Sequence, residues 1–259
     1  MILTVDIGNT ETMVGAYRDL EPLRSWRIGS DRARTGDELA FMLDGFLVPR
    51  AEGEPLVVDR AVIASVVPSL DWALEQACTS LGIPFRFLDG GAQLPIQLDV
   101  DMPAEVGADR VANTLAAAEL FQRDTLVVDL GTATTFDCIS AAGVFLGGVI
   151  APGPRAGMER LTDSAAQLSP VEIHPPDRVI GRNTAECVDS GVFHSAVDSI
   201  DGIVRRILAE WRPDDPLVVA TGGLAELFVP YCETVQRVEP YLTLTGLAIA
   251  DRYLSDTTE

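Results

Sequence analysis

Short apolar runs and longer stretches with helical spacing alternate along this chain, and turn residues separate them. Apolar runs of four to eight residues predict buried strands, whereas apolar residues that recur every three or four positions predict amphipathic helices. The apolar runs at 2–5 and 13–17 predict a strand hairpin, and a third strand is expected near 25–28. Residues 35–47 predict a helix, because Thr35 suits the N-cap and Asp37 and Glu38 suit the first turn.

The remaining chain continues the same alternation. The pattern predicts helices at 70–81, 111–121, 156–161, 187–211 and 244–254, and strands at 59–67, 85–88, 125–129, 135–140, 144–150 and 217–220. Residues 89–108 and most of 151–183 are predicted to be loops, because turn-forming residues are frequent there. We therefore expect an α/β fold with two lobes, each a mixed sheet flanked by helices. The N-terminal lobe is predicted to span 1–122 and the C-terminal lobe 123–259.

Two near-copies of one motif occupy corresponding places in these lobes. The first reads Thr-Val-Asp-Ile-Gly-Asn-Thr at 4–10, and the second reads Val-Val-Asp-Leu-Gly-Thr-Ala-Thr at 127–134. In each copy a predicted strand ends at an aspartate, Asp6 or Asp129, and the glycine that follows permits a tight turn. Such a turn directs backbone N–H groups at an anion, and the aspartate is suited to hold a metal ion. One copy alone is more often a plain turn, but two copies suggest related lobes facing each other across a nucleotide.

Composition then excludes several classes of function. The chain carries a net charge of −20, with 19 arginines and no lysine, so nucleic acid and anionic membrane surfaces are not expected partners. A P-loop is excluded, because that motif requires a lysine. No apolar run reaches the roughly 18 residues of a membrane span and no leader pattern is present, so a cytoplasmic location is expected. The four cysteines lack metal-ligand spacing and are expected to be buried, reduced thiols.

Four further motifs have both a structural and a functional interpretation. Asp109, in Gly-Ala-Asp-Arg at 107–110, is either a first-turn helix cap or a general base that Arg110 holds ionised. The glycine-rich segments at 147–153 and 221–223 either form tight turns or let backbone approach a ligand. In the segment 180–184, Asn183 or Thr184 is a candidate cap for the long helix that follows.

Taken together, these six motifs resemble the type III pantothenate kinase family, which belongs to the acetate kinase, sugar kinase, Hsp70 and actin superfamily. The resemblance covers nearly the whole chain and implies two actin-like (ribonuclease H-like) lobes. It implies an enzyme that uses ATP to phosphorylate pantothenate to 4′-phosphopantothenate, the first step of coenzyme A biosynthesis. It also implies a homodimer with pantothenate bound near the interface.

The resemblance further implies a role for individual residues. Asp109 would be the catalytic base, Asp6 would position Mg²⁺, and Asp129 would hold a monovalent cation, K⁺ or ammonium. Pantothenate would be bound by Val100, Gly107, Ala108, Asp109, Arg110 and Thr184. ATP would be bound by Asp6, Ile7, Gly8, Asn9, Thr10, Glu11, Thr12, Met13, Thr132, Gly222 and Gly223.

The chain departs from the family pattern just before Pro103. Family members usually carry a tyrosine and an asparagine where this chain has Val100 and Met102. A hydroxyl and an amide that help to receive pantothenate are therefore missing. Two alternatives stay open: a kinase of another small alcohol, and a non-catalytic regulator built on the same scaffold.

Overall fold

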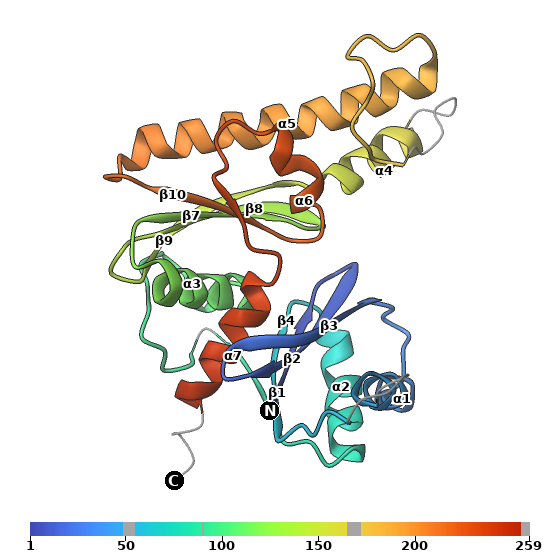
Figure 1. Ribbon diagram of the computed structural model, residues 1–259, viewed down its shortest axis with the longest axis vertical. Helices are drawn as coiled ribbons and strands as arrows, with labels where there is room; N and C mark the ends of the chain where they lie inside the picture. Colours follow the sequence, from blue (N-terminus) through green and yellow to red (C-terminus); the bar gives the residue numbers. More distant parts are fainter. Residues whose placement is uncertain (49–54, 90, 165–171, 255–259) are drawn as a thin grey trace. The chain divides into compact units, whose positions relative to one another are not determined.

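A computed structural model describes residues 1–48, 55–89, 91–164 and 172–254, and these residues form two compact units (Figure 1). Unit 1 comprises Met1–Leu120 and Leu242–Glu259, and unit 2 comprises Phe121–Tyr241. The first boundary lies two residues before the expected one. The C-terminal segment, however, belongs to unit 1, whereas we expected it in the C-terminal lobe.

Contacts between two helices explain this difference. The C-terminal helix α7 (Leu242–Leu254) packs on α3 (Ala108–Phe121) and on the sheet of unit 1. The Thr243 hydroxyl donates to Asn113 Oδ1 over 2.9 Å, and both side chains are buried. Gly246 lies so close to Ala112 that a Cβ there would overlap the Ala112 carbonyl. Because such close packing requires a residue without a side chain, the two helices form one interlocked pair.

The sheet of unit 1 combines a meander with a parallel part. Its strand order is β3-β2-β1-β4-β5, in which β1, β2 and β3 are antiparallel while β4 and β5 run parallel to β1. Helices α1 and α2 pack side by side on one face (Figure 1). The elements are β1 (Ile2–Ile7), β2 (Glu11–Arg18), β3 (Glu21–Gly29), α1 (Gly36–Leu47), β4 (Arg60–Ser65), α2 (Pro68–Ser80) and β5 (Phe85–Phe87).

The two faces of β1 have different neighbours. Leu3, Val5 and Ile7 lie in one core cluster with the apolar faces of α1 and α2. Since successive side chains of a strand alternate, Thr4 and Asp6 face the other way. That second face is covered by α7, because a Cβ on Gly15, the register partner of Thr4, would lie 3.1 Å from the Leu244 side chain.

The sheet of unit 2 repeats this plan. Strands β9, β8 and β7 form an antiparallel meander, and β10 and β11 run parallel to β7, which gives the order β11-β10-β7-β8-β9. The prediction of an α/β fold with a mixed sheet in each half is confirmed. The elements are β7 (Thr125–Leu130), β8 (Ala133–Ile139), β9 (Val144–Pro152), α4 (Pro154–Ser164), α5 (Thr184–Trp211), β10 (Leu217–Thr221) and β11 (Arg237–Val238).

The long helix α5 covers one face of this second sheet. Leu126, Val128 and Leu130 of β7 share a core cluster with Phe193 and Val204 of α5. Asp129 is therefore on the opposite face of its strand, as Asp6 is in unit 1. In both copies of the motif, the residue after the aspartate is a core residue that fixes the direction of the carboxylate.

The sequence located the long elements and missed the short ones. Helices α2, α3, α5 and α7 begin two or three residues earlier than expected, and α4 is longer at both ends. The structure adds β6 (Gln97–Leu98), α6 (Ala225–Phe228) and the two 3₁₀ helices η1 (Pro103–Glu105) and η2 (Val229–Tyr231) to the expected elements, as well as β11. Residues 90 and 165–171 of the predicted loops lie outside the described residues. No helix in the described part of the chain is long and apolar enough to cross a membrane.

Candidate active site

The first motif copy forms the turn between β1 and β2. Gly8 N donates to the carbonyl of Glu11 over 3.1 Å, which closes the turn, and a Cβ on Gly8 would lie 2.9 Å from that same oxygen. Asn9 and Thr10 at the tip are exposed, whereas Ile7 and Thr12 on either side are buried. A rigid base therefore presents a short polar tip to solvent, as an anion-binding turn requires.

The candidate base, Asp109, lies in the first turn of α3 and is half-buried. Its Oδ1 accepts the backbone N–H of Arg110 over 2.8 Å and folds back over Gly107, where a Cβ would lie 2.5 Å from it. Gly107 in turn lies against the Val66 side chain, and Val66 N donates to the carbonyl of Ile7 over 3.0 Å. This series of contacts places Asp109 at the end of the sheet where β1 ends, which is also where Asp6 lies.

The pKa of Asp109 differs from the sequence-based expectation. Burial raises the pKa of its carboxyl, and this effect exceeds the opposing effects of the Arg110 backbone N–H and the Arg110 charge. We expected Arg110 to dominate and to keep Asp109 ionised. Desolvation has the larger effect because the carboxylate folds back over Gly107 at the start of α3 and is largely removed from water. A raised pKa makes the carboxylate a better proton acceptor.

The second motif copy forms the corresponding turn between β7 and β8. Gly131 N donates to the carbonyl of Ala133 over 3.1 Å, and Thr132 is exposed at the tip. Gly153, at the end of β9, packs directly on this turn, and a Cβ there would overlap the carbonyl of Thr132. The glycine that closes the 147–153 segment therefore has a structural role, because it supports the turn from behind.

The glycines of the 221–223 segment lie beside Asp129. Thr221 of β10 is the register partner of Asp129 on β7, and Gly222 follows with a φ of +88°. A Cβ on Gly222 would overlap Oδ1 of Asp129. Leu224 N donates to the carbonyl of Leu130 over 3.1 Å, which fixes the loop to the end of β7. The structure therefore brings Asp129, Gly131, Thr132 and Gly222 to one end of the unit 2 sheet.

Both aspartates fit cations that prefer oxygen ligands. Each stands half-buried at a strand end, beside exposed backbone or hydroxyl groups of a turn, and Asp129 Oδ1 occupies the space that a side chain on Gly222 would fill. Across the described residues, no group of three or more His, Cys, Asp or Glu side chains is close enough to enclose a metal ion. A single carboxylate at a strand end suits Mg²⁺, which is commonly held by one or two carboxylates together with substrate phosphates.

Thr184 borders a large cavity of unit 2. Asn183 caps α5 by accepting the backbone N–H of Glu186 over 3.0 Å, so Thr184 is the exposed first residue of the helix. The cavity has a volume of about 590 Å³ and a mostly apolar lining, with Thr134, Gly153 and Met158 across from Val188. Cys187 also lines it and is exposed, which corrects the expectation that all four cysteines are buried.

Val100 and Met102, which stand where family members usually carry a tyrosine and an asparagine, lie just before η1. Val100 is half-buried and Met102 has 58% of its surface exposed. Arg110 is half-buried in the first turn of α3, and its carbonyl accepts the Thr114 hydroxyl over 2.8 Å. Sequence reasoning missed the supporting role of Val66, because an apolar residue directly after a strand carries no chemical signal of its own.

Comparisons with known proteins agree with the motifs. The sequence model of a family described as Type III pantothenate kinase matches residues 2–206. A protein of Syntrophotalea carbinolica named Type III pantothenate kinase is 42% identical over 251 residues, covering 96% of this chain and 97% of that protein. A protein of the same name from Streptomyces avermitilis is 40% identical over 265 residues, covering 99% and 100%.

Solved structures show the same fold at low sequence identity. A conserved putative Baf family transcriptional activator from Campylobacter jejuni superposes with a TM-score of 0.59 at 19% identity, covering 98% of this chain and 99% of that one. A ROK family glucokinase from Streptomyces griseus, in complex with glucose and AMPPNP, superposes with a TM-score of 0.54 at 12% identity and the same coverage. These likenesses support the two-lobed, actin-like architecture that the motifs predicted.

Proposed function

This chain belongs to the type III pantothenate kinase family, and from that premise we propose that it transfers the terminal phosphoryl group of ATP to pantothenate. The products are ADP and 4′-phosphopantothenate, in the first step of coenzyme A biosynthesis. The observation that carries this proposal is Asp109, a half-buried carboxylate with a raised pKa at the sheet edge that also holds Asp6.

The reaction needs one proton acceptor and several groups that neutralise charge. The primary hydroxyl oxygen of pantothenate forms a bond to the terminal phosphorus, and the bond between that phosphorus and the oxygen of ADP breaks. The hydroxyl proton passes to the Asp109 carboxylate. Phosphoryl transfer depends mainly on positioning and on electrostatic stabilisation, so a well-placed base and ordered phosphates are the main requirements.

We assign ATP contacts to the motif turn of each unit, taken by itself. In unit 1 the Asp6–Met13 segment offers its backbone amides and the exposed Asn9 and Thr10 side chains to phosphate. In unit 2 the family resemblance assigns ATP contacts to Thr132, Gly222 and Gly223. Asp6 would hold Mg²⁺, and Asp129, whose Oδ1 lies against Gly222, would hold K⁺ or ammonium. Bound cations would neutralise phosphate charge, which matters in a chain that contains no lysine.

Pantothenate is assigned to the start of α3 and to Thr184. Gly107, Ala108 and Arg110 adjoin the base, and Arg110 supplies a positive charge for the carboxylate of pantothenate. Val100 and Met102 offer no hydroxyl or amide, so backbone groups and Arg110 must replace the polar partners that other family members use. The carboxylate of the substrate is thereby matched to a chain whose net charge would otherwise repel it.

We further propose that the protein acts as a cytoplasmic homodimer, with the pantothenate site near its interface. The support lies beside Thr184, where Val179 and Ile180 have 69% and 83% of their surface exposed and the apolar cavity of unit 2 opens. Exposed apolar side chains next to an apolar cavity are typical of a surface that another protein covers. A second copy of this chain is the occupant that the family resemblance implies.

The proposal is tested by measuring ADP release with and without pantothenate. The assay contains ATP, Mg²⁺ and K⁺, and ADP formation is coupled to NADH oxidation. We expect turnover that requires pantothenate and saturates with it. Turnover with a different small alcohol but not with pantothenate would favour the alternative kinase. Absence of any stimulated turnover in folded protein would favour the non-catalytic regulator.

A further inference from the structure

Arg32 is a positive charge placed next to the first phosphate-binding turn. Its Nη2 donates to Asn9 Oδ1 over 2.9 Å, so the guanidinium lies at the exposed tip of the turn between β1 and β2. Asn9 accepts one of the five N–H donors of an arginine, which leaves the others available. Because the chain contains no lysine, a cation for bound phosphate must come from an arginine or from a metal ion.

The loop that carries Arg32 is fixed to the turn. Ser30 N donates to the carbonyl of Thr10 over 2.9 Å, and the hydroxyls of Ser30 and Thr12 are 2.8 Å apart. Within the loop, Asp31 Oδ1 accepts the backbone N–H of Ala33 over 3.0 Å. The loop then enters the N-cap of α1 directly. Arg32 is therefore held by several hydrogen bonds at a constant distance from the turn.

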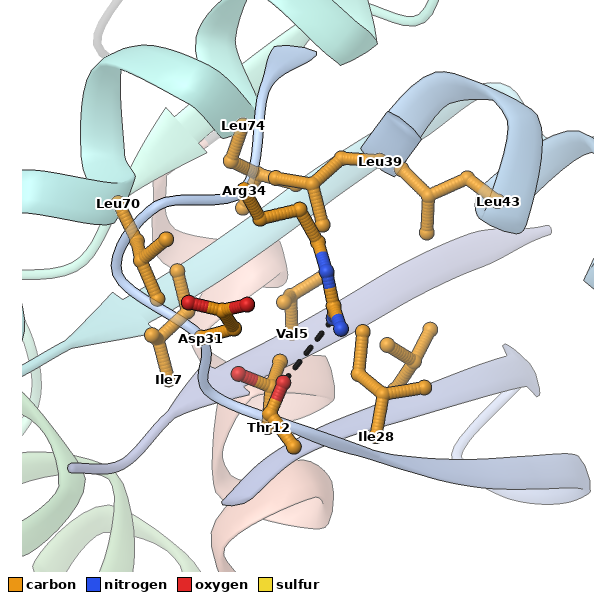
Figure 2. A pocket seen from close by; sticks show the side chains of 12 residues that line it. Val5, Ile7, Thr12, Ile28, Asp31, Arg34, Leu39, Leu43, Leu70 and Leu74 are labelled. Carbon is orange, nitrogen blue, oxygen red and sulfur yellow. Dashed lines mark hydrogen bonds between the residues drawn. The ribbon is translucent and has the colours of Figure 1, made fainter. Parts of the chain in front are cut away.

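Arg34, two residues further on, has a different role. Figure 2 shows its side chain extending across a small apolar cavity that Val5, Leu39 and Leu70 help to line. Its Nη1 donates to the carbonyl of Gly29 over 3.0 Å, which closes the base of the loop. The cavity has a volume of about 20 Å³, enough for one water molecule, so it is no ligand site. Arg34 supports the loop, while Arg32 remains on its outer side.

Several other arginines in the described part of the chain form ion pairs with carboxylates. Arg27 pairs with Glu11, Arg60 with Asp251 and Arg205 with Glu233. Within the described ranges, Arg32 makes no ion pair with a carboxylate. In a protein with a net charge of −20, an arginine held without a carboxylate partner beside an anion-binding turn is suited to receive an anion.

We propose that Arg32 binds the terminal phosphate of ATP and thereby makes the site prefer a nucleoside triphosphate to a diphosphate. This inference rests on the proposed function in one respect, namely that ATP phosphates are held by the turn at residues 8–10. Asn9 orients the guanidinium, and the remaining N–H donors approach the phosphate oxygens. Planar guanidinium groups bind phosphate through two parallel hydrogen bonds, which an ammonium group cannot do.

The test compares nucleotide binding by three variants, without pantothenate, so that no turnover is needed. Arg32→Ala removes the charge. Arg32→Lys keeps the charge but lacks the planar guanidinium that donates two parallel hydrogen bonds. Arg24→Ala is the matched control. Arg24 is an exposed arginine of the same sheet, on β3, whose register partner is Ala16. Dissociation constants for Mg·ATP and Mg·ADP are measured by calorimetry, and thermal unfolding confirms that each variant is folded.

For Arg32→Ala we expect the Kd of ATP to rise by about tenfold to 100-fold, as for loss of a charge-assisted hydrogen bond, and the Kd of ADP to change less than about threefold. The Kd of ATP for Arg32→Lys should lie between the values for the parent protein and Arg32→Ala, and the Kd for Arg24→Ala should match that of the parent protein. An equal effect on ATP and ADP, or no effect on either, would overturn the proposal. If the parent protein shows this ATP preference but no pantothenate-dependent turnover, the proposed function fails while the role of Arg32 stands.

Discussion

Gly222 presents its α-carbon directly to the carboxylate of Asp129. Asp129 lies on β7 and Gly222 directly follows the neighbouring parallel strand β10, whose last residue, Thr221, is the register partner of Asp129. A side chain on Gly222 would overlap Oδ1 of Asp129 and would lie 2.7 Å from the backbone nitrogen of Leu130. The glycine is therefore required both for its φ of +88° and for the space beside the carboxylate.

We predict that Gly222→Ala destabilises the protein and lowers its activity. The positive φ and the overlap together should cost about 1–3 kcal/mol of unfolding free energy, because the β7 backbone cannot yield easily. The measurement is denaturant unfolding, together with ADP release at several K⁺ concentrations. Gly45→Ala is the control, since Gly45 lies within α1 with no atom within 4 Å of its Cβ position. It should be neutral or stabilising by up to about 1 kcal/mol, and equal stability of the two variants would contradict the account.

We predict that Asp109→Asn lowers the turnover rate by a factor of about 10²–10⁴ while the protein stays folded. The amide is close in shape to the carboxylate but cannot accept the hydroxyl proton. In the parent protein, kcat/KM should fall toward low pH with a midpoint above 3.8, because burial raises the pKa of Asp109 and the base must be deprotonated. A loss smaller than about tenfold in folded protein would mean that Asp109 serves as a helix cap only.

The same pKa shift predicts the effect of this substitution on stability. The folded state binds the Asp109 proton more tightly than the unfolded state, so this carboxyl favours folding fully below pH 3.8 and loses that contribution as pH rises through the raised pKa. Ionised Asp109 thus costs stability at neutral pH, and a neutral asparagine avoids the cost. The Tm of Asp109→Asn should exceed that of the parent, by more at pH 8 than at pH 5. The opposite sign at pH 8 would contradict a desolvated carboxylate.

The sequence predicted the two motif turns correctly because each is local: a buried strand, an aspartate, a glycine and small polar residues follow one another directly. It also predicted that Asn183 or Thr184 would cap α5, and Asn183 does so. It could not predict that α7 packs on α3, because the close approach of Gly246 and Ala112 joins residues far apart in the chain. Likewise, the burial of Asp109, which raises its pKa, could not be inferred from the neighbouring Arg110.

We predict that activity requires a monovalent cation in addition to Mg²⁺. Asp129 lies near the end of a buried strand, against Gly222, and the chain has no lysine to neutralise the phosphates. Replacing K⁺ with tetramethylammonium should reduce turnover strongly, and ammonium should restore it. The Asp129→Asn variant should lose most of this response. Full activity in sodium or tetramethylammonium buffers would contradict the assignment of Asp129.

We predict that Ile180→Glu disrupts the proposed homodimer. Ile180 has 83% of its surface exposed in the single chain, beside the cavity that Thr184 lines, and a carboxylate there would have to be desolvated on association. Sedimentation at micromolar concentration should show monomers, with a raised KM for pantothenate. The control is Phe41→Glu, an equally drastic change at a residue of α1 that is 81% exposed. Monomers in both variants, or dimers in both, would contradict an interface at Ile180.

The most direct test of the central claim is to identify the product. The parent protein and Asp109→Asn are each incubated with ATP, pantothenate, Mg²⁺ and K⁺, and the products are followed by ³¹P NMR. We predict that the parent protein forms one phosphate monoester, on the primary hydroxyl of pantothenate, in equal amount to ADP, and that Asp109→Asn forms almost none. Formation of ADP with inorganic phosphate alone, or equal ester formation by both proteins, would contradict a pantothenate kinase that uses Asp109 as its base.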